Sequence, residues 1–151
     1  MSRVAVILHE RLGTWSSQLR GRLQDRPVRW FETRSTADLD AALLGVACPV
    51  VVFDLSRNLE ALRDLARLIQ IAPGARTLVL DPDATPGVAA LARELGATEV
   101  ISGFVPPPEV AVRIDRWIGL ASAEIEQTGW SRSLSADAPI DSESWFETAF
   151  E

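Results

Sequence analysis

The sequence predicts a doubly wound α/β fold, in which a five-stranded parallel sheet lies between two layers made from five helices. Short runs rich in Val, Ile and Phe alternate five times with segments whose apolar residues recur every three or four positions. Several of these runs are apolar almost throughout, as in strands that are covered on both faces. A length of 151 residues with 47% apolar residues fits one domain with a substantial core.

The five strands are expected at residues 3–9, 28–33, 49–55, 75–80 and 98–102. The first, third and fourth are nearly continuous apolar runs, which places them inside the sheet. The second, VRWFET, alternates more and is more polar, as an edge strand is.

A helix is expected after each strand. Ser35, with Asp38 three residues later, predicts a capping box, and Thr85-Pro86 predicts a cap followed by the first helical position. The apolar residues at helical spacing are Trp15, Leu19 and Leu23; Leu39, Leu43 and Val46; Leu62, Ala66 and Ile69; Val88, Leu91 and Leu95; and Val110, Ile114, Trp117, Ile118 and Ala121.

Composition excludes several classes of protein. The formal charge of −6 argues against nucleic acid as the main partner, and the basic residues are fifteen arginines with no lysine. The lone Cys48 excludes an internal disulfide and is typical of a small buried apolar residue. No apolar run approaches the ~18–20 residues of a membrane helix, and no signal peptide is visible, so we expect a cytoplasmic protein without membrane contact.

The chain divides into an expected domain at 1–126 and an acidic tail at 127–151. The tail holds five acids, one Arg and the aromatic residues Trp130, Trp145, Phe146 and Phe150, which predicts a flexible segment with aromatic anchors. The tetrapeptide WFET occurs at 30–33 and again at 145–148. The repeat is either coincidence or a segment that pairs with a sheet edge, in its own chain or in another.

The strand ends carry the residues that bear chemistry. His9 and Glu10 follow the first strand, Asp54 ends the third, Asp81 ends the fourth, and Ser102-Gly103 follows the fifth. With ELGATEVI before the fifth strand and PPPEVAVRI before the last helix, residues 3–122 resemble the receiver domain of bacterial response regulators. The resemblance implies a flavodoxin-like fold with strand order 2-1-3-4-5, a phosphoacceptor position at Asp54, and an acidic pocket of Glu10, Asp54 and Asp81 with His9, Ser102 and Gly103 as neighbours.

Most of the residues that form the family's phosphorylation site are absent. His9 replaces one of two metal-binding acids, Asp81 stands where a hydroxyl residue belongs, and Gly103 stands where a lysine would begin the next loop. A phosphoryl group needs a metal ion and a cation to offset its charge, whereas Asp81 would repel it. Glu10 and Asp54 give weak support for Mg²⁺, and His9 is a poor ligand for that ion.

We therefore expect a degenerate receiver-like domain that acts by binding a protein partner or a second copy, with no cofactor and no enzymatic activity. Two alternatives stay open: an atypical phosphoacceptor that uses Asp54, and a flavodoxin-like domain that binds a cation or small ligand at the acidic pocket. Asp54 itself can simply close a buried strand. No Gly-rich phosphate loop and no nucleophile elbow is visible.

The expected partner surface follows from the same resemblance, since receivers usually bind partners through the fourth helix, fifth strand and fifth helix. The candidates on this surface are Phe104, Val105 and Trp117. The tail adds Trp130, Trp145, Phe146 and Phe150, because bulky aromatics among acidic residues are typical of a segment that folds on binding. For Trp117 the core is the favoured location.

Overall fold

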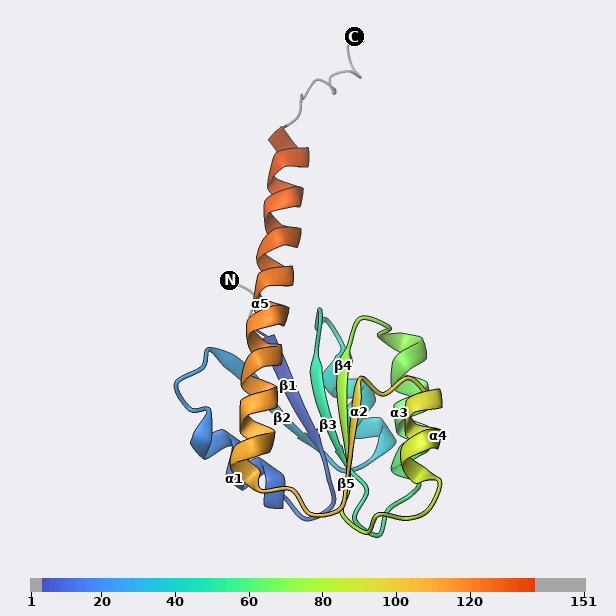
Figure 1. Cartoon of the computed structure of the whole chain (residues 1–151). Helices are drawn as coiled ribbons and strands as arrows, with labels where there is room; N and C mark the ends of the chain where they lie inside the picture. Colours follow the sequence, from blue (N-terminus) through green and yellow to red (C-terminus); the bar gives the residue numbers. More distant parts are fainter. Residues whose placement is uncertain (1–3, 138–151) are drawn as a thin grey trace.

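The computed structural model describes residues 4–137 and shows five parallel strands alternating with five helices (Figure 1). The elements are β1 (Val4–His9), α1 (Thr14–Arg22), β2 (Val28–Thr33), α2 (Thr36–Leu43), β3 (Val50–Asp54), α3 (Ala61–Ile71), β4 (Arg76–Asp81), α4 (Val88–Glu94), β5 (Glu99–Ser102) and α5 (Pro107–Asp137). The strand order is β2-β1-β3-β4-β5, as predicted. The predicted doubly wound fold and all five strands are confirmed.

The sheet separates two apolar clusters. Strand residues such as Leu8, Val52 and Leu80 pack under α1 and α5 on one face, and Ile7, Phe53 and Val79 pack under α2, α3 and α4 on the other. Figure 1 shows α5 and α1 together on one side of the strands. Because successive strand residues alternate between faces, the continuous apolar runs supply both clusters at once.

Two helices bury a face different from the expected one. In α3 the buried residues are Ala61, Leu62, Leu65 and Leu68, whereas the predicted Ala66 and Ile69 are only partly buried. In α4, Leu91 is exposed and Ala92 is buried. Both segments carry apolar residues on more than one side, so spacing alone could not select the side that meets the sheet.

Helix starts agree with the sequence in one case and differ in another. Ser35 and Asp38 form the predicted capping box at α2, with side chains and backbone N–H groups bonded reciprocally. The predicted Thr85 cap is wrong, because α4 starts at Val88 after Gly87, whose φ is 82°. That left-handed conformation suits a residue without a Cβ atom.

Helix α5 extends beyond the expected domain boundary at 126 and reaches Asp137. It projects past the amino ends of the strands (Figure 1). Residues 138–151 of the expected tail lie outside the described residues. No helix in the described part of the chain is both long and apolar enough to cross a membrane.

Candidate functional site

The candidate site lies at the carboxyl edge of the sheet. His9, Asp54, Asp81 and Ser102 are the last residues of β1, β3, β4 and β5, and Glu10 follows β1 directly. Strand alternation directs Asp54 toward the side of α1 and α5, and Asp81 toward the side of α3 and α4. The predicted residues therefore share one edge of the sheet, but their side chains leave the sheet on different faces.

Glu10 acts as the cap of α1. Its Oε1 accepts a hydrogen bond from the Trp15 N–H at 2.9 Å and its Oε2 accepts one from the Ser16 N–H at 2.7 Å. Gly13, at the cap position, has no side chain to do this. The buried carboxylate thus replaces the missing cap and faces the positive end of the helix dipole. Both oxygens are occupied, which is unlike a free metal ligand.

Asp54 closes the turn after β3. Its Oδ1 accepts hydrogen bonds from the Ser56 N–H at 3.2 Å and from the Ser56 hydroxyl at 2.8 Å. The next residue, Leu55, continues the sheet by donating its N–H to the Leu80 carbonyl at 2.9 Å. This geometry is that of an Asx turn at a strand end, which needs no ligand.

Asp81 is the most deeply buried of the three acids, with 1% of its surface exposed. Its Oδ2 accepts the Thr85 N–H at 3.0 Å, and its carbonyl accepts the Gly103 N–H at 2.8 Å. The Oδ1 atom has no hydrogen-bond partner within the described part of the chain. Asp81 thereby holds the β4–α4 loop and ties it to the loop that follows β5.

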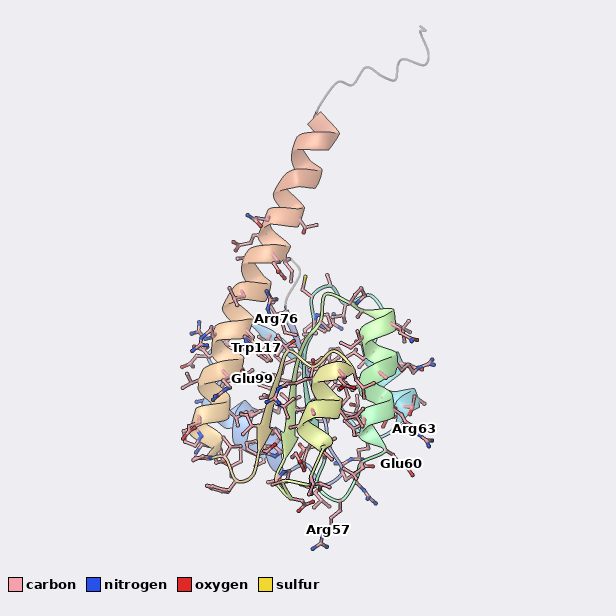
Figure 2. All side chains as sticks on the ribbon, turned by 45° about the vertical axis from the view of Figure 1, so that its right-hand side comes forward. Arg57, Glu60, Arg63, Arg76, Glu99 and Trp117 are labelled. Carbon is pink, nitrogen blue, oxygen red and sulfur yellow. The ribbon has the colours of Figure 1, made fainter. Side chains whose placement is uncertain are left out.

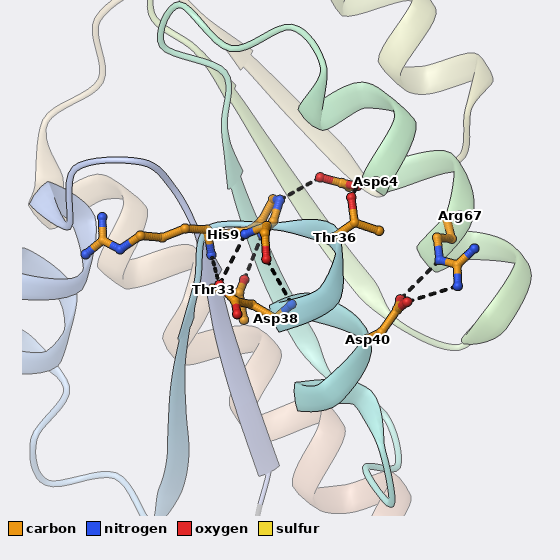
Figure 3. A network of polar contacts seen from close by, with 9 residues as sticks. His9, Thr33, Thr36, Asp38, Asp40, Asp64 and Arg67 are labelled. Atoms are coloured by element: carbon orange, nitrogen blue, oxygen red, sulfur yellow. Dashed lines mark hydrogen bonds and ion pairs between the residues drawn. The ribbon is translucent and has the colours of Figure 1, made fainter.

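His9 belongs to a polar network that the sequence did not reveal (Figure 3). Its Nδ1 lies 2.7 Å from the Thr33 hydroxyl oxygen, and its Nε2 lies 2.8 Å from Asp64 Oδ2. The Thr36 hydroxyl donates to the other oxygen of Asp64 at 2.5 Å. With the imidazole proton on Nε2, every member of this chain of contacts is satisfied.

The network joins four elements. His9 is in β1, Thr33 ends β2, Thr36 begins α2 and Asp64 is in α3. A bidentate pair between Arg67 and Asp40 adds a second link from α3 to α2 (Figure 3). One signal could have revealed Asp64: it lies between Ala61 and Leu65 on the buried face of α3, where an acid needs a partner.

The order hydroxyl, imidazole and carboxylate is also that of a nucleophilic triad. Here His9 and Thr33 are each only 2% exposed, so a substrate has no access to the hydroxyl. Within residues 4–137, no group of three or more His, Cys, Asp or Glu side chains could hold a metal ion. The arrangement therefore supports structure rather than catalysis.

The arginines near the site are bonded to loop carbonyls or point away from it. The Arg11 guanidinium donates to the Arg57 carbonyl at 3.3 Å, and the Arg34 guanidinium donates to the Arg11 carbonyl. Arg57, three residues after Asp54, points away from the domain (Figure 2). Among the side chains that the structure describes, no arginine forms an ion pair with Glu10, Asp54 or Asp81.

Cys48 lies at the opposite, amino edge of the sheet, beside α5. Burial first, and then the neighbouring Glu124 carboxylate, raises the pKa of the Cys48 thiol. Arg76, at the start of β4, forms two hydrogen bonds with Glu124 at 3.0 and 2.9 Å, and this contact lowers the pKa of Glu124. Cys48 is only partly buried, which differs from the small buried residue that the sequence predicts.

The structure divides the partner-binding candidates. Phe104, in the β5–α5 loop, is 85% exposed, whereas Val105 and Trp117 are buried in the cluster under α5. Val105 and Trp117 therefore present little surface to a partner, and the core location favoured for Trp117 is confirmed. Trp130 lies in α5 but its side chain is not described, and Trp145, Phe146 and Phe150 lie outside the described residues.

Sequence comparison gives no match to any protein-family model and none to the curated proteins. Solved structures match at low identity. A response regulator from Thermotoga maritima has 14% identity and a TM-score of 0.64, covering 79% of this chain and 99% of that chain. The signal receiver domain of an HD domain-containing protein from Pseudomonas fluorescens Pf-5 has 18% identity and a TM-score of 0.65, covering 83% and 94%.

A third match is the signal receiver domain of a LuxO repressor-like protein from Vibrio parahaemolyticus, with 13% identity and a TM-score of 0.66 over 82% of this chain and 95% of that one. The agreement covers nearly the whole of each neighbouring domain. The described part of this chain therefore has the fold of response regulator receiver domains.

Proposed function

We propose that this chain is a degenerate receiver domain that acts by binding protein partners and does not depend on phosphorylation of Asp54. The observation that carries the proposal is Asp81, a buried carboxylate at the strand end where receivers carry a hydroxyl residue. A phosphoryl group on Asp54 would bring more negative charge to this edge.

The cations that would offset this charge are missing, engaged, or, in the case of Arg57, directed away from the domain. The chain contains no lysine, and the nearby Arg11 and Arg34 hold loop carbonyls. Glu10, a retained acid of the metal-binding pair, uses both oxygens to cap α1. Without a bound metal and a cation, the transferred group has nothing that stabilises its charge.

Exposed apolar residues support the binding role. Phe104, Val112 and Leu120 are exposed on the β5–α5 loop and on α5. Large apolar side chains gathered over adjacent elements are typical of an interaction surface. The replacement Phe104→Asp should weaken partner capture without loss of stability, because this side chain packs little of its surface.

The decisive experiment is intact-mass measurement after incubation of the full chain with acetyl phosphate and Mg²⁺. The proposal expects an unchanged mass. A gain of about 80 Da, the mass of one phosphoryl group, that is lost in Asp54→Asn would instead establish the atypical phosphoacceptor.

A further inference from the structure

The outer side of β2 is a free sheet edge within the described part of the chain, because β2 pairs only with β1. The Thr33 carbonyl accepts the Glu10 N–H, so the backbone of Thr33 faces β1. Backbone groups of successive residues point to alternate sides of a strand, which directs those of Trp30 and Glu32 to the free edge. Such an edge can accept an added strand.

The segment that contains β2 carries a net positive charge. Residues 11–34 hold six arginines and two acids, in a protein whose net charge is −6. Arg20 pairs with Glu32 and Arg26 pairs with Asp115. Arg29 is exposed on β2, and its guanidinium lies over the Phe31 ring at 5.1 Å. An acidic segment is therefore the complementary occupant.

The chain's own C-terminal segment has that composition. Residues 138–151 contain four acids and no basic residue, and the sequence at 145–148 repeats the WFET of β2. In β2 this tetrapeptide forms part of a strand, so its alternation of side chains suits a sheet.

The direction of the chain favours a sixth strand beside β2, connected to β5 through α5. The chain passes from β1 through α1 to β2, moving toward the β2 edge over the face that α1 shares with α5 (Figure 1). A connection from β5 through α5 to a strand outside β2 moves in the same direction over the same face. It therefore has the same hand as the α1 crossover, and right-handed crossovers are almost universal in parallel sheets.

The available length is sufficient. Glu124 is bonded to Arg76 at the amino edge of the sheet, and the helix continues to Asp137, about 20 Å further at 1.5 Å per residue. The eight residues from Asp137 to Trp145 span up to about 27 Å when extended. From the end of α5 the chain must return about 20 Å to the amino edge of the sheet and move about 10 Å sideways, across two strand spacings. Both distances together are within this reach.

We infer that residues 138–151 dock on β2 of the same chain as a sixth, parallel strand. An in-register pairing of the two WFET copies would set Glu147 beside Glu32, which is unfavourable. An offset of two residues keeps the alternation of faces, sets Glu147 beside Trp30, and brings Phe146 beside the exposed Arg29. A protein that binds at β2 must then displace this segment.

The offset specifies which backbone groups pair. The Thr148 N–H donates to the Trp30 carbonyl, whereas the Ala149 N–H points away from β2. Proline has no N–H, so Thr148→Pro removes a bond between strands, while Ala149→Pro, one residue later, removes none. The two variants of the full chain form a matched pair.

Amide hydrogen exchange by NMR tests the inference. In the wild type we expect the Trp30 and Glu32 amides to exchange about tenfold more slowly than in Thr148→Pro. Ala149→Pro should exchange like the wild type, and the Arg29 and Phe31 amides, bonded to β1, should not change in either variant.

Equal exchange at Trp30 and Glu32 in all three proteins would overturn the inference. Equal acceleration by both prolines would also overturn it, since only one removes a bond to β2. Protection that is lost on dilution, together with a dimeric mass in sedimentation, would overturn docking within one chain by showing that a second copy supplies the segment.

Discussion

Replacing Glu10 by Gln separates two roles for this buried acid. If Glu10 is one of several repelling carboxylates that await a cation, neutralising it removes repulsion and raises the free energy of unfolding. If it caps α1, as the bonds to Trp15 and Ser16 indicate, neutralising it lowers that free energy. The sign of the change therefore distinguishes a metal-site remnant from a structural cap.

The magnitude follows from the two bonds. A hydrogen bond to a charged acceptor contributes about 1.5–3 kcal/mol, and a buried N–H left without an acceptor costs about 1–3 kcal/mol. Gln retains one acceptor oxygen and turns its NH₂ group toward the second N–H. We therefore expect Glu10→Gln to lower the free energy of unfolding by about 2–4 kcal/mol.

Urea unfolding followed by circular dichroism measures this loss. With a slope of about 2 kcal/mol per molar urea, the midpoint should fall by roughly 1–2 M. Glu60→Gln is the matched control, because Glu60 stands at the start of α3 without a side-chain cap bond, and we expect its effect to stay within about 0.5 kcal/mol. An unchanged or raised midpoint for Glu10→Gln, together with a Mg²⁺-dependent midpoint in the wild type, would refute the cap.

Three further predictions concern other contacts. His9→Ala should lower the free energy of unfolding, measured in urea, by about 3–4 kcal/mol, because it leaves a cavity and two unpaired partners. Asp64→Asn should lower it by less, and equal small decreases in both variants would contradict the network. Glu124→Gln should speed alkylation of Cys48 near pH 8.5, because it removes a contact that raises the thiol pKa; unchanged kinetics would show that burial alone controls the thiol. Arg76 lowers the pKa of Glu124, so their ion pair stabilises the fold while Glu124 is ionised, and this contribution is lost as the pH falls through that pKa. Arg76→Gln should therefore flatten the acid side of the plot of unfolding free energy against pH. An unchanged plot would contradict the pair.

The sheet was predictable because its strands are buried on both faces and therefore form unmistakable apolar runs. The edge position of β2 was predictable from its polar alternation. The buried faces of α3 and α4 were not, because Leu91 and Ala92 are both apolar and only the fitted sheet surface decides which is covered.

The position of the site was predictable from the sequence, whereas the hydrogen bonds of its side chains were less so. Parallel strands bring His9, Asp54 and Asp81 to one edge, which any sequence with these strands implies. The role of Glu10 depends on Gly13 adopting a left-handed conformation with a φ of 79°. The partner of His9 lies 55 residues away, in a helix whose position on the sheet sets the contact.

Titration of the full chain with beryllofluoride and Mg²⁺, followed by fluorine NMR and by the backbone amide signals of Ser56 and Leu55, tests the central claim most directly. The receiver domain of DrrB, whose solved structure is activated by this phosphoryl mimic, serves as the positive control. An edge whose acids are engaged in structural bonds, and form no ion pair with an arginine in residues 4–137, predicts no bound fluorine signal and no shift at these amides. A saturable bound signal that disappears in Asp54→Asn would contradict the account.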